Sequence, residues 1–457
     1  MMHWNNCFTN KRLGQAENSQ SDRSDYERDY DRIIFSSAFR RLQNKTQVFP
    51  LPEHVFVHNR LTHSLEVASV GRSLGEITGK YISSLPEVKK DKKAVDFYQN
   101  HLKSVVAAAC LAHDLGNPAF GHSGEEAISK YFIERGEKDK KFKKRFTEKQ
   151  WADLIKFEGN ANALRILSKQ FKGRMPGGYQ LTYPTMASIL KYPCAAYQRD
   201  KKKLHLKKYG YFQSDKEIFS NICRELNMIP DPENKGAFLR HPFVFLVEAA
   251  DDICYSIIDF EDAHRLGILS TAEVINAFTA LISLNKNEDQ DKLQSRLRVL
   301  EADKNEQIAY LRAKSISTLV QMVCEVFQNN ADKILKGQFN TSLMDGIEIA
   351  RNVLKDIEKT SIHRIYNYKS VIKIEMAGFR IMSGLIEDFT EAALTPESER
   401  LSRHEKLLLL IPLQYHFDEN DSDYEKVMSV LDFISGMTDV YALELYKNLR
   451  GIDIPNI

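Results

Sequence analysis

Glycine and proline are scarce in this chain, with 21 glycines and 13 prolines among 457 residues. Their combined share is below the usual level of about 12%. Because few residues favour turns, the composition favours long helices over a fold of many short strands. The sequence also has no long Gly/Ser/Pro linker and no internal repeat. We therefore expect one helical body with charged excursions near 134–150 and 199–216.

Signals for disulfides, membrane spans and nucleic-acid attraction are also missing. The 6 cysteines include no CxxC pair, and the formal net charge is only +2. The longest apolar runs, such as 105–112, are far too short to span a bilayer, and the first residues lack the apolar core of a signal peptide. These absences argue against a disulfide scaffold, a membrane protein and a global attraction to nucleic acid. They predict a cytoplasmic protein with reduced thiols.

Residues 105–122 carry the first indication of chemistry. Their apolar residues predict a buried helix whose last turn holds the adjacent His113 and Asp114, with Gly116 as a left-handed cap. Carbonyl groups at a helix C-terminus carry partial negative charge, so a cation is favoured there. Taken alone, however, such a pair is more often a helix cap with an ordinary hydrogen bond.

Two further predicted helices carry partners for this pair. Residues 58–77 have apolar residues at helical spacing, with His63 near their start. Residues 241–267 are strongly apolar yet contain Asp251 and Asp252, and carboxylates there are costly to bury unless they are paired, bonded or metal-bound. Imidazole and carboxylate together suit a divalent cation that activates water. Spacing alone leaves both aspartates open as the fourth ligand.

Two other features near these ligands fit phosphate chemistry. Arg60 lies one helical turn before His63, so it can point toward the same site and bind phosphate; its ordinary alternative is a surface salt bridge. His122 lies nine residues after His113, and with Glu125 it can form a proton-transfer pair. The alternative for this pair is a capping histidine beside an exposed glutamate.

The order His, His-Asp, Asp over three helices resembles the HD-domain metallophosphohydrolase superfamily. Within it, the chain is most similar to the deoxyguanosine triphosphate triphosphohydrolase family, nearly end to end and in the family's order. The stretches that carry the resemblance are 23–50, HNRLTHSLEV (58–67), LAHDLGNPAFGHSGEEA (111–127), FEGNANALRIL (157–167), HPFVFLVEAADDICYSIIDFEDA (241–263) and ISGMTDVYALELY (434–446).

The resemblance implies an all-α fold with an HD catalytic core at 1–270. A helical region at 271–457 would contribute to the nucleotide site and to oligomer contacts. The implied reaction is attack of metal-activated water on the α-phosphorus of a deoxynucleoside triphosphate, with dGTP favoured, releasing deoxynucleoside and tripolyphosphate. The alternatives are an HD nucleotidase acting on nucleoside monophosphates and a non-catalytic nucleic-acid-binding scaffold. The scaffold would have lost a ligand or His122, and none is lost.

The family also implies the metal site and the catalytic pair. The metal would be Mn²⁺ or Mg²⁺, held by His63, His113, Asp114 and Asp251. Asp251 is chosen over its neighbour because Tyr255 and Asp259 match nucleotide-site residues four and eight positions beyond the family's ligand. His122 and Glu125 match the family's catalytic histidine and glutamate.

Substrate contacts and partners follow from the same resemblance. Arg60 and Lys208 match phosphate contacts, Gln47 matches a contact to the 3′-hydroxyl, and Tyr366 resembles a tyrosine under the sugar. Asn117 stands where related nucleotide hydrolases often carry a second histidine, which favours the triphosphohydrolase branch. Implied partners are a homo-oligomer, hexameric in the family, and a single-stranded DNA or nucleotide effector. The apolar stripe at 427–446 fits a core or an interface alike.

Overall fold

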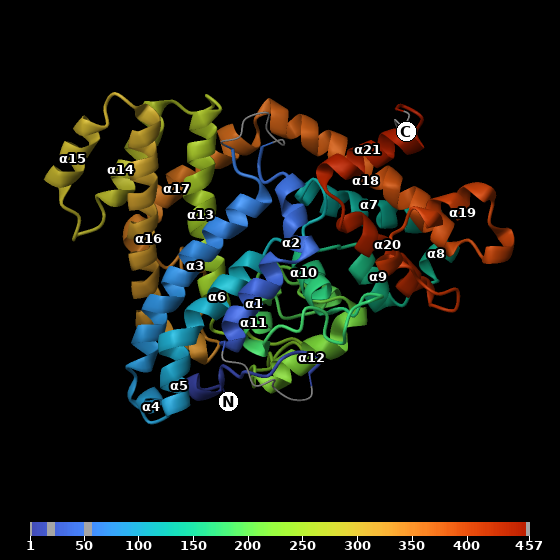
Figure 1. The fold of residues 1–457 in the computed structure, drawn as a ribbon, viewed down its shortest axis with the longest axis horizontal. Helices are drawn as coiled ribbons and strands as arrows, with labels where there is room; N and C mark the ends of the chain where they lie inside the picture. Colours follow the sequence, from blue (N-terminus) through green and yellow to red (C-terminus); the bar gives the residue numbers. More distant parts are fainter. Residues whose placement is uncertain (1, 16–22, 50–56, 454–457) are drawn as a thin grey trace.

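The structure is a computed structural model that describes residues 2–15, 23–49 and 57–453. Within these ranges the chain forms helices and loops, and its β-pairing is limited to isolated bridges. This confirms the predicted all-α fold. The molecule is elongated, with α15 near one end and α19 near the other (Figure 1). Among the described helices, none has both the length and the apolar character that a bilayer span requires.

The first hydrophobic core is built around α3, which packs along α6 and α13, with α16 on its other side. Helices α14 and α16 pack on each other and on α13. The first core therefore continues past residue 270, where we expected the boundary between the two regions. That boundary stays a prediction. The helices around this core are α1 (Asp25–Ile34), α2 (Ser37–Arg41), α3 (Arg60–Ser83), α4 (Pro86–Lys89), α5 (Lys92–Asp96), α6 (Leu102–Ala112), α11 (Tyr183–Ile189), α12 (Lys216–Glu225), α13 (Val244–Arg265), α14 (Thr271–Ile282), α15 (Gln290–Val299), α16 (Lys304–Leu335) and α17 (Arg351–Thr360).

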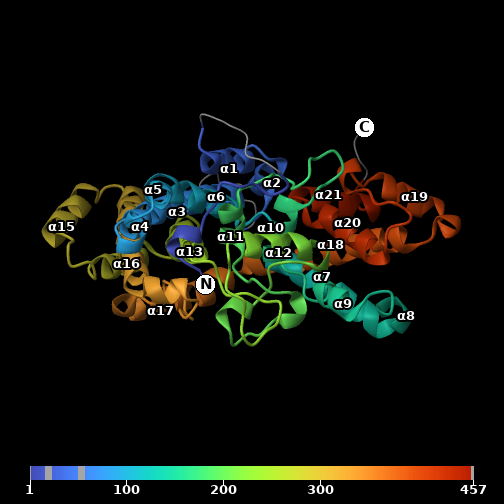
Figure 2. The ribbon, with the colours of Figure 1, turned by 90° about the horizontal axis from the view of Figure 1, so that it is seen from below.

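The second core lies toward the other end of the molecule, where α18 packs against α7 and α20 (Figure 2). Most of the apolar stripe at 427–446 is buried in it: Val427, Met428, Leu431, Ile434, Met437 and Leu445, while Leu443 is exposed. The stripe is thus mainly core within one chain. The helices of this part are α7 (His122–Lys138), α8 (Lys140–Lys143), α9 (Glu148–Leu154), α18 (Lys369–Leu394), α19 (Ser402–Leu409), α20 (Asp423–Ser435) and α21 (Asp439–Leu449). Helix α10 (Gly159–Ser168) joins the two cores: Ala161 packs in the second, and Ala163, Leu164 and Leu167 pack in the first.

Buried ion pairs fasten segments that are distant in sequence. Arg165 of α10 donates two hydrogen bonds to Asp432 of α20, at 2.6 and 2.8 Å, with both side chains buried.

The six cysteines are all buried and unpaired, which agrees with the expected free thiols.

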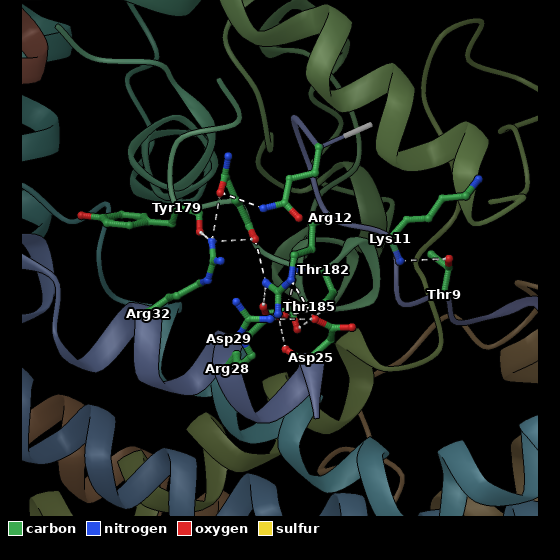
Figure 3. A network of polar contacts seen from close by, with 12 residues as sticks. Thr9, Lys11, Arg12, Asp25, Arg28, Asp29, Arg32, Tyr179, Thr182 and Thr185 are labelled. Carbon is green, nitrogen blue, oxygen red and sulfur yellow. Dashed lines mark hydrogen bonds and ion pairs between the residues drawn. The ribbon is translucent and has the colours of Figure 1, made fainter. Parts of the chain in front are cut away.

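The N-terminal segment is held on α1 by a second buried network (Figure 3). Arg12 donates to Asp25 Oδ1 at 3.1 Å, to Asp29 Oδ1 at 2.7 Å and to the carbonyl of Gln180 at 2.8 Å. The other oxygen of Asp29 accepts from the amide and the hydroxyl of Thr182. Because Arg12 and Asp29 are buried, each charge depends on the other for compensation.

We expect Arg12→Met to lower the free energy of unfolding by about 3–5 kcal/mol, because Asp29 stays buried and loses its cation. A matched control is Arg145→Met, which breaks the partly exposed pair with Asp423 and should cost less than about 1 kcal/mol. Urea denaturation followed by circular dichroism measures both. Equal losses in the two variants would contradict this role for the network.

Candidate active site

A pocket of about 530 Å³ opens where the two cores meet, lined by α3, α13, the α6–α7 loop and the first turns of α18. Its size suits a small-molecule ligand. Nine of the twelve residues predicted as metal ligands, catalytic pair or substrate contacts line it: Gln47, Arg60, His113, Asp114, His122, Lys208, Asp251, Tyr255 and Tyr366. The other three, His63, Glu125 and Asp259, each contact one of these lining residues.

Local structure places the two histidines beside the pocket. The Asn59 side chain accepts from the Thr62 amide at 3.0 Å and caps α3, so His63 lies one turn inside the helix, where it is buried. Helix α6 ends at Ala112 with His113 as its cap, so the expectation that the His-Asp pair lies in the last helical turn is wrong by one to two residues. The chain turns earlier than the apolar pattern indicates.

The expected left-handed cap at Gly116 is also wrong, because Gly116 has no positive φ. Its role is close packing. A Cβ atom at this position would lie 1.9 Å from the carbonyl oxygen of Gly159, at the start of α10. The absence of a side chain therefore lets the loop after Asp114 lie directly against α10.

The candidate metal ligands converge from three helices. Ligand atoms of His63, His113 and Asp114 lie within 4.8 Å of one another. Asp251 Oδ1 lies 3.2 Å from His63 Nε2 and 3.4 Å from His113 Nε2. Burial opposes ionisation of Asp251, but the His113 and His63 rings hold the pKa of its carboxyl well below the usual range. For the neighbouring Asp252, burial instead raises the pKa to about 7.

The His113 ring fits the role of a metal ligand. Its Nδ1–H donates to the carbonyl of Cys110 at 2.6 Å, which directs Nε2 toward the carboxylates. Nε2 is buried and makes no well-formed hydrogen bond, although it faces Asp251 Oδ1 at 3.4 Å, so its lone pair is available to a cation held between the two. Burial lowers the pKa of His113, but Asp114 and Asp251 raise it overall, to about 9. The cluster therefore attracts positive charge, and its nitrogen and oxygen donors suit a divalent ion.

Arg60 joins this cluster instead of facing solvent. Its Nη1 donates to Asp114 Oδ2 at 2.8 Å, while Asn117 Nδ2 donates to the other oxygen at 2.6 Å. Burial opposes ionisation of Asp114, yet Arg60 lowers its pKa overall. The Nε of Arg60 is buried without a hydrogen-bond partner. The guanidinium thus lines the pocket with bonding capacity that a ligand can use.

His122 and Glu125 form the expected pair at the start of α7. His122 Nδ1 lies 2.8 Å from Glu125 Oε2, and Glu125 Oε1 accepts from the Gly159 amide at 2.7 Å. Burial opposes ionisation of Glu125, but His122 and Lys208 lower its pKa overall. A carboxylate only accepts, so the His122 Nδ1 carries the hydrogen and its Nε2 is available for proton exchange. The His122 side chain is 82% exposed, which leaves Nε2 accessible from the pocket.

Two lysines add positive charge to the same pocket. Lys208 Nζ lies 3.1 Å from Glu158 Oε1, and Lys191 Nζ lies 3.3 Å from Glu248 Oε1. Burial would lower the pKa of Lys191, but Glu248 keeps it above its ordinary value, so the lysine is charged. Sequence reasoning missed Lys191. The available signal was a lysine two residues after the end of α11, a charge beside an apolar helix like the one that drew attention to Asp251.

Aromatic residues form the opposite wall of the pocket. The rings of Tyr255 and Tyr366 stack with centroids 5.5 Å apart and planes 28° from parallel. The Tyr366 hydroxyl donates to Asp259 Oδ2 at 2.8 Å, so Asp259 lies behind the aromatic pair. Burial raises the pKa of Asp259 to about 8. Gln47 lines the pocket, and its Oε1 is buried without a hydrogen-bond partner.

An all-α scaffold with a buried His/Asp cluster of this kind is typical of HD-domain phosphohydrolases. Residues 60–175 match the HD domain family, and residues 341–448 match the phosphohydrolase-associated domain family. A deoxyguanosinetriphosphate triphosphohydrolase-like protein of Synechocystis sp. is 38% identical over 99% of this chain and 100% of its own length. The deoxyguanosinetriphosphate triphosphohydrolase of Yersinia enterocolitica is 32% identical over 94% of each chain. The chain belongs to the HD-domain family of deoxyguanosinetriphosphate triphosphohydrolase-like proteins.

We expect Asp251→Ala to lose Mn²⁺, because the cluster then lacks one oxygen donor and the negative charge that attracts a cation. Asp252→Ala is the matched control and should keep the metal. Elemental analysis after dialysis measures the content, and a melting curve gives an independent readout. Mn²⁺ at 100 times its Kd should stabilise a competent protein by about 2.7 kcal/mol. Full metal content in Asp251→Ala with none in Asp252→Ala would reverse the choice of ligand.

Proposed function

We propose that the chain hydrolyses deoxynucleoside triphosphates to deoxynucleoside and tripolyphosphate, with dGTP as the favoured substrate. The observation that carries the proposal is the content of one pocket. It gathers the His/Asp cluster, the His122–Glu125 pair, three cationic side chains and an aromatic wall. The name of the Yersinia enterocolitica relative supports dGTP as the substrate.

The cluster residues His63, His113, Asp114 and Asp251 would hold a divalent ion, Mn²⁺ or Mg²⁺. Such an ion, when bound, activates water and offsets phosphate charge. Arg60, Lys191 and Lys208 would bind the phosphate chain, with Arg60 using the planar fork that suits phosphate oxygens. Three cations around one pocket match a triphosphate better than a single phosphate, which favours this reaction over a monophosphate nucleotidase.

Proton transfer is assigned to His122. Its Nδ1–H is held by Glu125, whose second oxygen is fixed by the Gly159 amide, so the ring is oriented from behind. The free Nε2 would donate a proton to the leaving 5′-oxygen as the bond to the α-phosphorus breaks. Glu125, whose pKa is lowered, stays ionised and keeps the ring oriented.

Sugar recognition is assigned to the aromatic wall and Gln47. The unpartnered Oε1 of Gln47 would accept a hydrogen bond from the 3′-hydroxyl. The Tyr366 ring is fixed by its stacking on Tyr255 and its bond to Asp259, so it would form a rigid floor under the sugar. A 2′-hydroxyl against that floor would lose its water partners and gain none, which disfavours ribonucleotides.

The product should be intact tripolyphosphate. Ion-exchange chromatography of the reaction of purified protein with dGTP and Mn²⁺ identifies the product. Orthophosphate or pyrophosphate as the first product would refute the triphosphohydrolase assignment.

The rate should depend on His122. His122→Ala should keep the metal and lose about 10²–10⁴-fold in kcat, the usual contribution of general acid–base catalysis. The exposed neighbour of Glu125 gives a control, since Glu126→Ala should keep the wild-type rate. An unchanged rate in His122→Ala would remove that residue from the mechanism.

Discrimination between dGTP and GTP should depend on Tyr366. Tyr366→Ala opens space under the sugar and should raise kcat/KM for GTP relative to dGTP. The nearby Tyr368 does not line the pocket, so Tyr368→Ala should leave the ratio unchanged. Gln47→Ala should lower kcat/KM for dGTP and blunt the preference for dGTP over a 2′,3′-dideoxy analogue. Equal wild-type efficiency on GTP and dGTP would exclude this account of selectivity.

A further inference from the structure

The loop at 115–121 sets the distance between the two halves of the site. It starts directly after Asp114 in the metal cluster and ends directly before His122. Any shift of this loop moves His122 relative to the cluster, and a displacement near 1 Å can lower a rate by about 10²-fold. What holds the loop is therefore a question about catalysis as well as stability.

The loop is held from the C-terminal part of the chain. The Phe120 amide donates to Asp439 Oδ1 at 2.9 Å. Lys45 Nζ donates to the carbonyl of Asn117 at 2.6 Å and to that of Ser435 at 3.0 Å. Residues 435–439, from the end of α20 to the start of α21, thus hold the loop in two ways: directly through Asp439, and through Lys45, which bridges Ser435 to Asn117. These contacts join segments more than 300 residues apart in sequence.

Asp439 holds a second segment with its other oxygen. The Thr46 amide donates to Asp439 Oδ2 at 2.8 Å, and the next residue, Gln47, lines the pocket. Asp439 is buried at the first position of α21, where the helix dipole favours a carboxylate. It does not cap its own helix, because the Thr438 hydroxyl performs that role by accepting from the Tyr441 amide. Both carboxylate oxygens are used on amides of distant pocket segments.

The loop conformation requires such support. Phe120 adopts a φ of +62°, a left-handed conformation that is strained for a bulky residue and persists only when its surroundings fix it. Its ring lies over Gly378 of α18, where an added Cβ would be 2.4 Å from Phe120 Cγ. Asp439 fixes the Phe120 amide while α18 leaves room for the ring, so both contacts define one loop position.

We propose that Asp439 is a positioning residue of the active site. It holds the loop at 115–121 and residues 46–47 in place relative to each other through the amides of Phe120 and Thr46. It acts through these segments and does not touch the substrate. The proposal rests on the proposed function for its kinetic consequence. Its structural consequence, protection of the Phe120 and Thr46 amides, can be measured without any substrate.

The test is Asp439→Asn, which keeps the size of the side chain but places an amide donor against one of the two backbone donors. A control is Asp423→Asn, also at the first position of a C-terminal helix but paired with Arg145 away from the pocket. Hydrogen exchange read at single-residue resolution should show faster exchange of the Phe120 or Thr46 amide in Asp439→Asn alone. With dGTP and Mn²⁺, kcat should fall by about 10–100-fold in that variant, with metal content unchanged.

Each outcome decides the proposal. Unchanged exchange at both amides overturns it, and so does faster exchange with full kcat. If the wild type does not hydrolyse dGTP, the proposed function fails, while the exchange data still decide whether Asp439 holds the two segments. Gly378→Ala gives a second route that leaves Asp439 intact, because the new Cβ pushes the Phe120 ring and hence the same loop. It should also lower kcat, and full kcat in a folded Gly378→Ala protein would refute control of the rate by loop position.

Discussion

The packing of α3, α6 and α13 depends on the compensation of charge at their contact. Asp251 faces His63 and His113 at 3.2 and 3.4 Å, and Arg60 faces Asp114 at 2.8 Å. Buried charges are tolerated only when each has a partner. The apolar surfaces of the three helices can therefore meet only in the register that pairs these groups, and the same register builds the pocket.

The second core provides part of the site from a distance. The C-terminal helices supply the anchor for the His122 loop, and α18 supplies pocket wall and space for Phe120. A side chain that directly follows a loop keeps a fixed position only when the loop is bonded on more than one side. Here the bonds come from α21 and from the amine of Lys45, so the C-terminal half is integral to the pocket.

Local pattern predicted the helices well and their ends less well. Periodicity and misplaced charges were sufficient to point to His63, His113 and the pair Asp251 and Asp252, because polar groups in apolar helices are conspicuous. The family resemblance was needed to choose Asp251 over Asp252. Helix α6 ends at Ala112, earlier than the apolar pattern indicates. The role of Gly116 could not be predicted, because it depends on close contact with α10. Asp439 was unpredictable for the same reason: a helix-start aspartate is common, and its partners lie hundreds of residues away. Family resemblance supplied roles that spacing did not, notably for Tyr366.

The turn that carries Tyr366 has a further consequence. Residues Ser361–Tyr366 continue α17 as a π-helical turn, which holds more residues per turn than an α-helix. Deleting one residue there and closing the turn as ordinary α-helix would remove about 100° of rotation, and the tighter winding of the remaining residues would restore a similar amount. Tyr366 would therefore keep its face toward Tyr255 and Asp259. A single codon can thus be lost from this segment in evolution while the aromatic wall of the pocket stays in place.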